Sequence, residues 1–469
     1  MKAIAILLGI LVPAATAVAC VAMLGVWLFG GPPIEVAERV PGTDRPPGTD
    51  TMQPTTSTAK PQLVQGDGVP AEVFGDWPRF RGRNFDGISD EFTALAKSWP
   101  TDGPERLWEI EVGEGYAAAA IWEGRVYVLD YDRRKKADVL RCLSLTDGKD
   151  IWRYSYPVDV KRNHGMSRTV PSVTEGAVVS LGPKCHVTCL EPKTGEFRWA
   201  LDLVKDFGTR VPPWYAGQCP LIEGGRVILA PAGPEALLVA VDAQKGEVLW
   251  RTPNPRGWRM THSSVMPMEF AGKRMYVYCA SGGVVGVSAD SGAILWETNA
   301  WKISIATVPS PVILGDGRIF LAGGYNAGSM VLQLKEAGGR ITAEPTLRLE
   351  PKVFGAAQQT PIYYHGCIYG VRPSGELVCL DLEGNVVWTS GPEHRFDLGP
   401  LLIAGGLLYV MNDTGLLVMA EATPQGYKPL AQAQVLSGHD AWGPMAIAGG
   451  RLIVRDLTHM VCLNVAAPK

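Results

Sequence analysis

An excess of charge of either sign is missing from this sequence. Its 469 residues hold 44 Lys and Arg against 47 Asp and Glu, a formal net charge of −3. A protein that binds nucleic acid normally carries a basic surface that neutralises phosphates. The one cationic run, Arg133 to Lys136, falls between two expected strands and is interpreted as a solvated hairpin tip. The charge balance therefore excludes nucleic acid as the expected partner.

Clustered metal ligands are also missing, and no two of the nine cysteines are adjacent. Cys185-His186-Val-Thr-Cys189 is the densest group, but a zinc site needs a second pair of ligands, and none follows. We therefore expect no metal. A local disulfide between Cys185 and Cys189 stays open as an alternative.

Long apolar runs are absent except at the N-terminus, where residues 3–29 are almost wholly apolar. At about 1.5 Å per residue this run exceeds the hydrocarbon core of about 30 Å. Lys2 precedes it, which favours a cytoplasmic N-terminus. Residues 1–30 are therefore predicted to be a transmembrane anchor or signal segment, with cleavage after Ala19 or lipidation of Cys20 as alternatives. Each alternative places the rest of the chain outside the cytoplasm.

A Pro- and Thr-rich stretch with few apolar residues follows, from residue 31 to residue 73. Such a composition buries too little apolar surface to offset the entropy of ordering, so it predicts a flexible linker. The remaining residues, 74–469, are predicted to form one domain.

A repeated pair of glycine and tryptophan, four residues apart, dominates that domain. A recurrence of this length marks a chain that repeats one supersecondary unit. The pairs are Gly148 and Trp152, Gly195 and Trp199, Gly246 and Trp250, Gly292 and Trp296, and Gly384 and Trp388.

Each repeat reads as about four short antiparallel strands, because β-branched and aromatic residues alternate between glycine turns. A proline, or alanine in the first repeat, precedes each copy, which gives eight copies. These residues are Ala119, Pro171, Pro220, Pro267, Pro311, Pro361, Pro400 and Pro444. Eight four-stranded units predict an all-β, eight-bladed β-propeller, in which radial repetition leaves only short sheet edges.

The two ends of the domain are each incomplete. The last copy, residues 450–465, lacks a tryptophan strand, whereas residues 107–112 form such a strand, with Trp108, and have no blade before them. We expect the two to complete one blade and close the ring. Two copies have lost the tryptophan: Leu347 or Leu349 is expected in its place in one, and a segment near Val435 in the other.

Four cysteines align with small residues in sister repeats and are expected at small inward-facing positions. Cys142, Cys189, Cys379 and Cys462 stand where Ala240 and Gly286 stand elsewhere.

The repeat resembles the pyrroloquinoline-quinone (PQQ)-like propeller family, whose unit reads as an apolar strand, Ala-Leu-Asp, a Thr-Gly turn and a Trp strand. Val239-Ala-Val-Asp242 through Gly246 to Trp250 is the nearest copy, and the resemblance covers about residues 99–465. The family includes quinone-dependent dehydrogenases and the propeller lipoprotein of the outer-membrane β-barrel assembly machine. It implies that the tryptophans dock blades on one another, namely Trp108, Trp152, Trp199, Trp250, Trp296 and Trp388.

The stretch from Asp76 to Gly82, Asp-Trp-Pro-Arg-Phe-Arg-Gly, resembles a lead-in found before many periplasmic members of the family. We expect it to pack on the outside of the ring.

Any ligand site is expected in the segments just before the repeated prolines, which in this family rim one mouth of the central channel. They are rich in Arg, His, Gln and aromatic residues, as an anionic, planar or sugar-like ligand, or a peptide carboxylate, would require. The candidate ligand-binding residues are Arg168, Gln218, Arg259, His262, Gln359, Arg395 and Trp442.

The dehydrogenases of the family carry two adjacent cysteines and a calcium or lanthanide ligand set, and neither is found in this sequence. We therefore expect a binding or protein-assembly scaffold with protein or peptide partners at the cell envelope. It is expected to be held by a single span in the cytoplasmic (inner) membrane, with the propeller on the periplasmic or extracytoplasmic side. A redox enzyme that uses PQQ with Ca²⁺ is the alternative.

Overall fold

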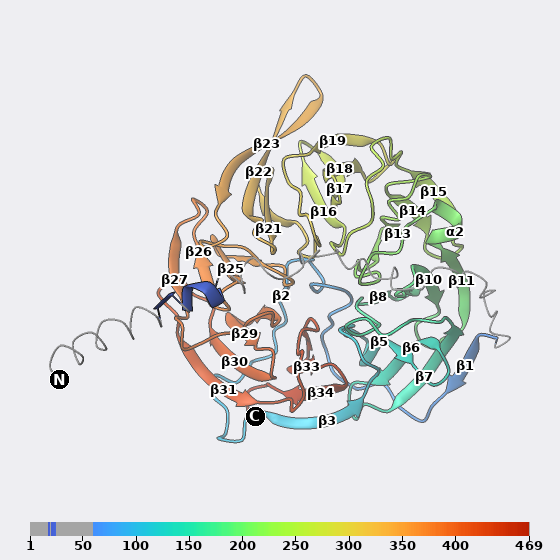
Figure 1. Cartoon of the computed structure of the whole chain (residues 1–469). Coiled ribbons are helices and arrows are strands. Elements are labelled where there is room, and N and C mark those ends of the chain that lie inside the picture. The colour runs from blue at the N-terminus through green and yellow to red at the C-terminus, as the bar shows by residue number, and fades with distance from the viewer. Residues whose placement is uncertain (1–16, 19, 25–59, 469) are drawn as a thin grey trace, which may run out of the picture. The chain divides into compact units, whose positions relative to one another are not determined.

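Eight sheets arranged in a ring make up the domain (Figure 1). The computed structural model describes residues 17–18, 20–24 and 60–468. All eight blades contain four antiparallel strands, as the repeats predict, and two of the sheets gain a fifth strand. The all-β, eight-bladed propeller is therefore confirmed. Most of the predicted anchor (residues 1–30) and most of the linker lie outside the described residues. No helix among the described residues has the length and apolar character needed to cross a membrane.

The first four blades follow the chain in order, with one short helix after the second. Their elements are β4 (Ala120–Trp122), β5 (Arg125–Asp132), β6 (Ala137–Ser144) and β7 (Asp150–Pro157); β8 (Ser172–Thr174), β9 (Ala177–Leu181), β10 (His186–Leu190), β11 (Phe197–Asp202) and α2 (Leu203–Phe207); β12 (Leu221–Glu223), β13 (Arg226–Leu229), β14 (Val239–Asp242) and β15 (Val248–Arg251); and β16 (Met266–Phe270), β17 (Lys273–Ala280), β18 (Gly283–Ser288) and β19 (Ile294–Thr298).

The other four blades complete the ring, and the long β22–β23 hairpin extends beyond its rim (Figure 1). Their strands are β20 (Val312–Gly315), β21 (Arg318–Gly323), β22 (Gly328–Ala337) and β23 (Arg340–Leu349); β24 (Ile362–Tyr364), β25 (Cys367–Val371), β26 (Leu377–Leu380) and β27 (Val386–Thr389); β28 (Leu401–Ala404), β29 (Leu407–Met411), β30 (Leu416–Glu421) and β31 (Pro429–Gln434); and β32 (Ala446–Ala448), β33 (Arg451–Arg455), β34 (His459–Asn464) and β3 (Glu105–Glu111).

The eighth blade combines both ends of the domain. Strand β3 pairs antiparallel with β34, and Trp108 lies opposite Cys462. Arg455, which is buried, donates from Nη1 to the Ala117 carbonyl of the first blade at 2.8 Å. The predicted closure of the ring is therefore confirmed.

The predicted flexible linker ends before residue 73. Strand β1 (Gln62–Gln65) pairs with β7 as a fifth strand of the first blade, and the backbone of Ala71 bonds to Gly124 at 3.0 Å. Leu63 lies against Gly195 of the second blade. This apolar contact and the free edge of β7 order a stretch that composition alone predicts to be flexible.

The recurring glycine and tryptophan meet between blades. A Cβ added to Gly148 would lie 2.9 Å from the ring of Trp108 in the preceding blade, and Gly148 has φ +73°. Only glycine allows both this close approach to the indole ring and this positive φ. In five blades the indole N–H donates to a carbonyl of the next blade at 2.8–3.1 Å: Trp108 to Leu145, Trp152 to Pro192, Trp199 to Ala243, Trp250 to Ala289, and Trp388 to Thr423.

Trp296 differs, since its indole contacts the Met275 sulfur of its own blade at 3.3 Å. In the following blade the register places Leu347 at the tryptophan position, opposite Val331. In the blade after Trp388 the strand near Val435 is β31, which ends at Gln434, and Ala431 holds the tryptophan position, opposite Met419. When alanine stands at the tryptophan position, the residue type no longer distinguishes this strand from the neighbouring strands in the sequence.

The four aligned cysteines are buried opposite the tryptophans of their own blades. All nine cysteines of the chain are among the described residues and all are free, so the open alternative of a Cys185–Cys189 disulfide is wrong. Their side chains lie on one strand and in the turn before it, where both pack into the apolar core.

A polar group is buried between the first and second blades. Asp138 is fully buried, and neither carboxylate oxygen has a hydrogen-bond partner. The hydroxyl of Tyr156 lies beside it without hydrogen-bond geometry, and Gly182 faces both from the second blade. Burial raises the pKa of Asp138 from 3.8 to about 7.

Replacing Asp138 by Asn is expected to stabilise the domain above pH 7 by up to about 4 kcal/mol and to have little effect near pH 4. The folded state holds the Asp138 proton more tightly than the unfolded state. The stability of the unsubstituted protein therefore falls as pH rises from about 4 to about 7. Urea unfolding at pH 4.5, 6 and 8 measures the difference. The exposed Asp159, replaced by Asn, is the control, and a difference that does not grow with pH would contradict the assignment.

Candidate functional site

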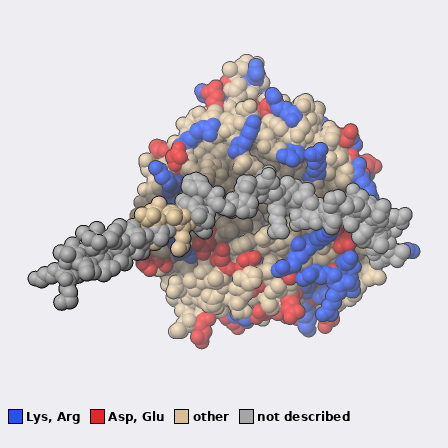
Figure 2. Space-filling model, in the orientation of Figure 1, with Lys and Arg blue, Asp and Glu red and all other residues tan. Residues whose placement is uncertain are grey.

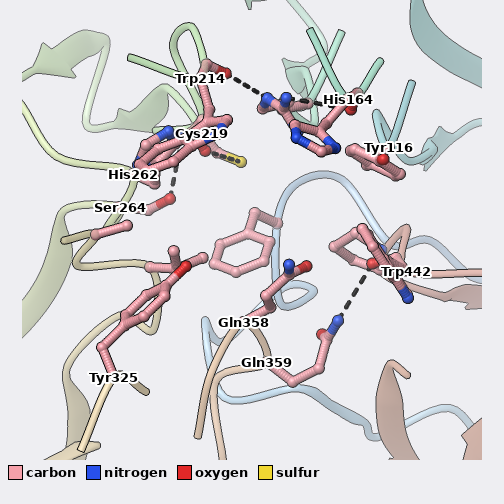
Figure 3. Close-up of a pocket in the computed structure, with 16 residues that line it drawn as sticks. Tyr116, His164, Trp214, Cys219, His262, Ser264, Tyr325, Gln358, Gln359 and Trp442 are labelled. Carbon is pink, nitrogen blue, oxygen red and sulfur yellow. Dashed lines mark hydrogen bonds between the residues drawn. The ribbon is translucent and has the colours of Figure 1, made fainter. Parts of the chain in front are cut away.

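A cavity of about 310 Å³ lies at one mouth of the channel, within the size range of small-molecule sites. Aromatic and polar side chains from several blades surround it (Figure 3). Its lining residues are Phe80, Tyr116, His164, Arg168, Trp214, Gly217, Cys219, His262, Ser264, Ala306, Val308, Tyr325, Gln358, Gln359, Trp442 and Pro444. Most of them belong to the segments that lead into the innermost strands, as expected from the sequence.

The lead-in segment lies against the channel side of the ring, and the expectation that it packs on the outside is wrong. Trp77 and Ile121 of β4 exchange backbone hydrogen bonds of 2.8–2.9 Å, and the Val173 N–H donates to Pro78. Strand β2 (Ile88–Ser89) then pairs with the innermost strand β28. The segment crosses the centre of the ring (Figure 1). Phe80 therefore closes the cavity from the channel side.

Arg81 fixes this segment. Its guanidinium is buried and donates only to backbone carbonyls, at 2.7–3.0 Å: Thr360, Pro361, Phe85 and Asp86. Burial lowers the pKa of Arg81 to about 10. Four carbonyl acceptors satisfy a planar, five-donor group that would otherwise be costly to bury.

Arg168 is the cation of the cavity. Nε donates to the Trp214 carbonyl, and Nη2 donates to Asn163 at 2.9 Å and His164 at 3.2 Å. Its guanidinium also lies 5.1 Å from the ring centre of Tyr116. Burial lowers the pKa of Arg168 to about 10, and among the described residues no carboxylate pairs with it.

His262 lines the same cavity as Arg168, as a neutral ring. Burial, followed by the charge of Arg168, lowers the pKa of His262 to about 4. Its Nε2 is buried and has no hydrogen-bond partner among the described residues. The ring lies 6.4 Å from that of Trp214. In a neutral imidazole one ring nitrogen donates and the other accepts, so Nε2 can accept a bond from a ligand when the proton is on Nδ1.

Tyr116 and Trp442 form another part of the cavity wall, and their rings lie 5.1 Å apart. The Tyr116 hydroxyl donates to Asp440 at 3.2 Å. Gln359 donates to the carbonyls of Leu398 and Trp442 at 3.0 and 3.2 Å. The amide of Gln358 points into the cavity (Figure 3).

Four of the seven sequence-predicted residues line the cavity, namely Arg168, His262, Gln359 and Trp442. The other three do not. Gln218 is fully buried and bonds to both backbone groups of Ala230. Arg259 and Arg395 are exposed.

Sequence reasoning missed Phe80, Tyr116 and Tyr325. Tyr116 stands just before Ala119, where the rule used for the other segments would have found it. Tyr325 lies in a β-hairpin, φ +54°, and Phe80 lies in the lead-in, so neither carried that signal.

A chain of hydrogen bonds joins neighbouring blades below the cavity mouth. In each link a backbone N–H donates to a side chain at the same position in the next blade, at 2.9–3.2 Å: Val170 to Cys219, Cys219 to Ser264, Ser264 to Ser310, and Ser310 to Thr360.

The repeated proline position predicted from the sequence is shifted in three blades. Strand register places Val265, Leu401 and Met445 at that position, so Pro267, Pro400 and Pro444 lie one or two residues away from it.

Replacing Ser310 by Ala is expected to cost about 1–3 kcal/mol, because it leaves the buried N–H of Ser264 without an acceptor. Urea unfolding measures the loss. Ser291, which is exposed and accepts a bond from Ala293 at 3.4 Å, is the matched control and should lose much less when replaced by Ala. Equal losses would contradict the role given to the inter-blade bonds.

Charge around the cavity is uneven. Lys and Arg side chains gather over the first blade (Figure 2), where Arg133 to Lys136 form the exposed tip of the β5–β6 hairpin. Arg133 pairs with Glu114 at 3.1 Å and Lys136 with Asp159 at 3.0 Å. In the part of the chain that the structure describes, no three His, Cys, Asp or Glu side chains come together as metal ligands.

Comparison with known proteins gives a family and a fold. A family model described as outer membrane protein assembly factor BamB matches residues 135–390, more than half of the chain. No curated protein sequence matches significantly.

Solved structures with the same fold share little sequence. BamB from Moraxella catarrhalis is 12% identical with a TM-score of 0.54, covering 77% of this chain and 99% of that one. A europium-containing methanol dehydrogenase is 12% identical with a TM-score of 0.59, covering 81% and 89%. The computationally designed Ika8 protein is 10% identical with a TM-score of 0.51, covering 76% and 99%. At these identities the likeness shows the propeller fold alone.

Proposed function

We propose that this chain, which belongs to the family of the outer membrane protein assembly factor BamB, is a membrane-tethered, extracytoplasmic scaffold that binds protein partners through the face bearing the cavity. The family supports a role in assembly, and the apolar run of residues 3–29 supports the tether. Propellers offer rigid faces on which loops present binding groups.

The cavity is the observation that carries this proposal. Arg168 is half-buried there, and among the described residues it has no carboxylate partner and Nε2 of His262 is buried without a hydrogen-bond partner. Buried polar groups are normally satisfied, so unused ones in an open cavity indicate a binding partner. The exposed basic hairpin from Arg133 to Lys136 lies on the neighbouring first blade and favours a partner with acidic groups.

Site-specific photo-crosslinking in the native membrane tests the proposal. Benzoylphenylalanine at Tyr325, which lines the cavity and is 46% exposed, should give a protein adduct. At Asp316, in the exposed turn at the other end of β21 in the same blade, it should give little or none. The adduct should weaken when Arg168→Gln is added. Equal adducts at both positions, or an adduct only at Asp316, would contradict the proposal.

A further inference from the structure

The cavity is bounded on its channel side by the lead-in segment. The backbone of the lead-in segment bonds to the innermost strands at Ile121 and Val173, and Phe80 closes the channel side. Arg81 holds the segment with four carbonyl bonds, so this closure is built into the fold. An extended peptide cannot pass through such a cavity, whereas the end of a chain can enter it.

One unpaired hydrogen-bond donor in the cavity favours an anionic ligand. Nε and Nη2 of Arg168 are used by backbone carbonyls, but Nη1 makes no hydrogen bond to any described residue. A guanidinium edge with free N–H groups and no protein carboxylate suits a ligand carboxylate. The carbonyl bonds fix the plane of the guanidinium before the ligand arrives.

One unpaired hydrogen-bond acceptor in the cavity favours a ligand that carries an N–H or O–H donor. Nε2 of the neutral His262 ring is buried, has no hydrogen-bond partner among the described residues, and can accept a bond from a ligand. The ligand must therefore carry a donor as well as a carboxylate.

The remaining walls are mostly apolar or aromatic. Phe80, Tyr116, Trp214, Tyr325 and Trp442 line the cavity together with Arg168 and His262. Figure 3 shows the labelled Tyr116, Trp214, Tyr325 and Trp442 around it. Such walls accept an apolar side chain and remove it from water.

We infer that the cavity captures the C-terminal residue of a partner polypeptide, with an apolar last side chain. The terminal carboxylate meets Arg168, the last amide N–H meets His262, and the side chain lies among the aromatic walls. Capture of a terminal carboxylate is a recurring mode of peptide recognition. This inference rests on the proposed scaffold function and names the part of the partner that enters the cavity.

Three small probes test it by calorimetry on the full chain in detergent: acetyl-Gly-Gly-Phe, its C-terminal amide, and 3-phenylpropionate, which keeps the ring and carboxylate but lacks the N–H. The free acid should bind at least tenfold more tightly than the amide and several-fold more tightly than 3-phenylpropionate. Equal binding of acid and amide would overturn the inference. Equal binding of acid and 3-phenylpropionate would overturn the role of His262.

Two variants distinguish binding in the cavity from attraction to the positive charge of the protein in general. Arg168→Gln keeps amide donors for the loop carbonyls but should abolish the difference between acid and amide. Arg259→Ala, an exposed arginine outside the cavity, should leave that difference unchanged. Equal effects of the two variants, with melting temperatures unchanged, would contradict the site. If Tyr325 crosslinks a partner while acid and amide bind equally, the scaffold proposal stands and the C-terminal inference fails.

Discussion

Removal of residues 450–469 is expected to abolish the folded propeller. The truncation deletes β33 and β34, leaves β3 without its partner strand β34, and opens two sheet edges in the eighth blade. It also removes Arg455, which bonds the last blade to Ala117 of the first. Unpaired edges promote aggregation, so the product should unfold or associate. Size-exclusion chromatography and thermal unfolding measure the outcome.

A shorter truncation provides the control. Removal of residues 467–469, which follow β34, leaves every blade strand in place and should change the melting temperature little. A monomeric product with an unchanged melting temperature after the longer truncation would contradict closure of the ring by β3 and β34.

Trp152→Ala is expected to lower the free energy of unfolding by about 3–5 kcal/mol. Trp152 is fully buried between the first two blades, contacts Gly195, and donates to the Pro192 carbonyl at 3.1 Å. The substitution removes the aromatic surface and leaves the Pro192 carbonyl with the Tyr127 hydroxyl, at 3.0 Å, as its remaining donor. Urea unfolding measures the loss.

Trp250→Ala is the matched variant, because Trp250 makes the same bond to the next blade but is only partly buried. Its loss should be clearly smaller. Equal losses, or a loss below about 1 kcal/mol for Trp152→Ala, would contradict the view that packing between blades is the main role of these rings.

The repeat made most of the fold predictable from sequence. Each glycine and tryptophan pair marks a local turn and the strand after it, so blade number follows from counting. Closure of the ring was predictable because the strand with Trp108 has no blade before it and the last copy lacks its outer strand. Where the tryptophan is replaced by a small residue, as at Ala431, the local signal disappears and the sequence predicts only a segment near Val435.

The site was less predictable because it depends on contacts between distant segments. Arg168 and His262 were found since both lie just before an innermost strand. Arg259 and Arg395 lie in equivalent segments but are exposed, and residue type alone cannot distinguish these cases. Phe80 was missed because only pairing between residues 77–89 and the innermost strands places it in the cavity.

The central claim is that the cavity receives a ligand between Arg168 and His262. The imidazole resonances of the full chain, labelled at its seven histidines, test this most directly. The resonance assigned to His262 through His262→Gln should shift and saturate with acetyl-Gly-Gly-Phe but not with its amide, while His365 and His459 should stay in place. An unmoved His262 resonance, or an equal shift with the amide, would contradict the account.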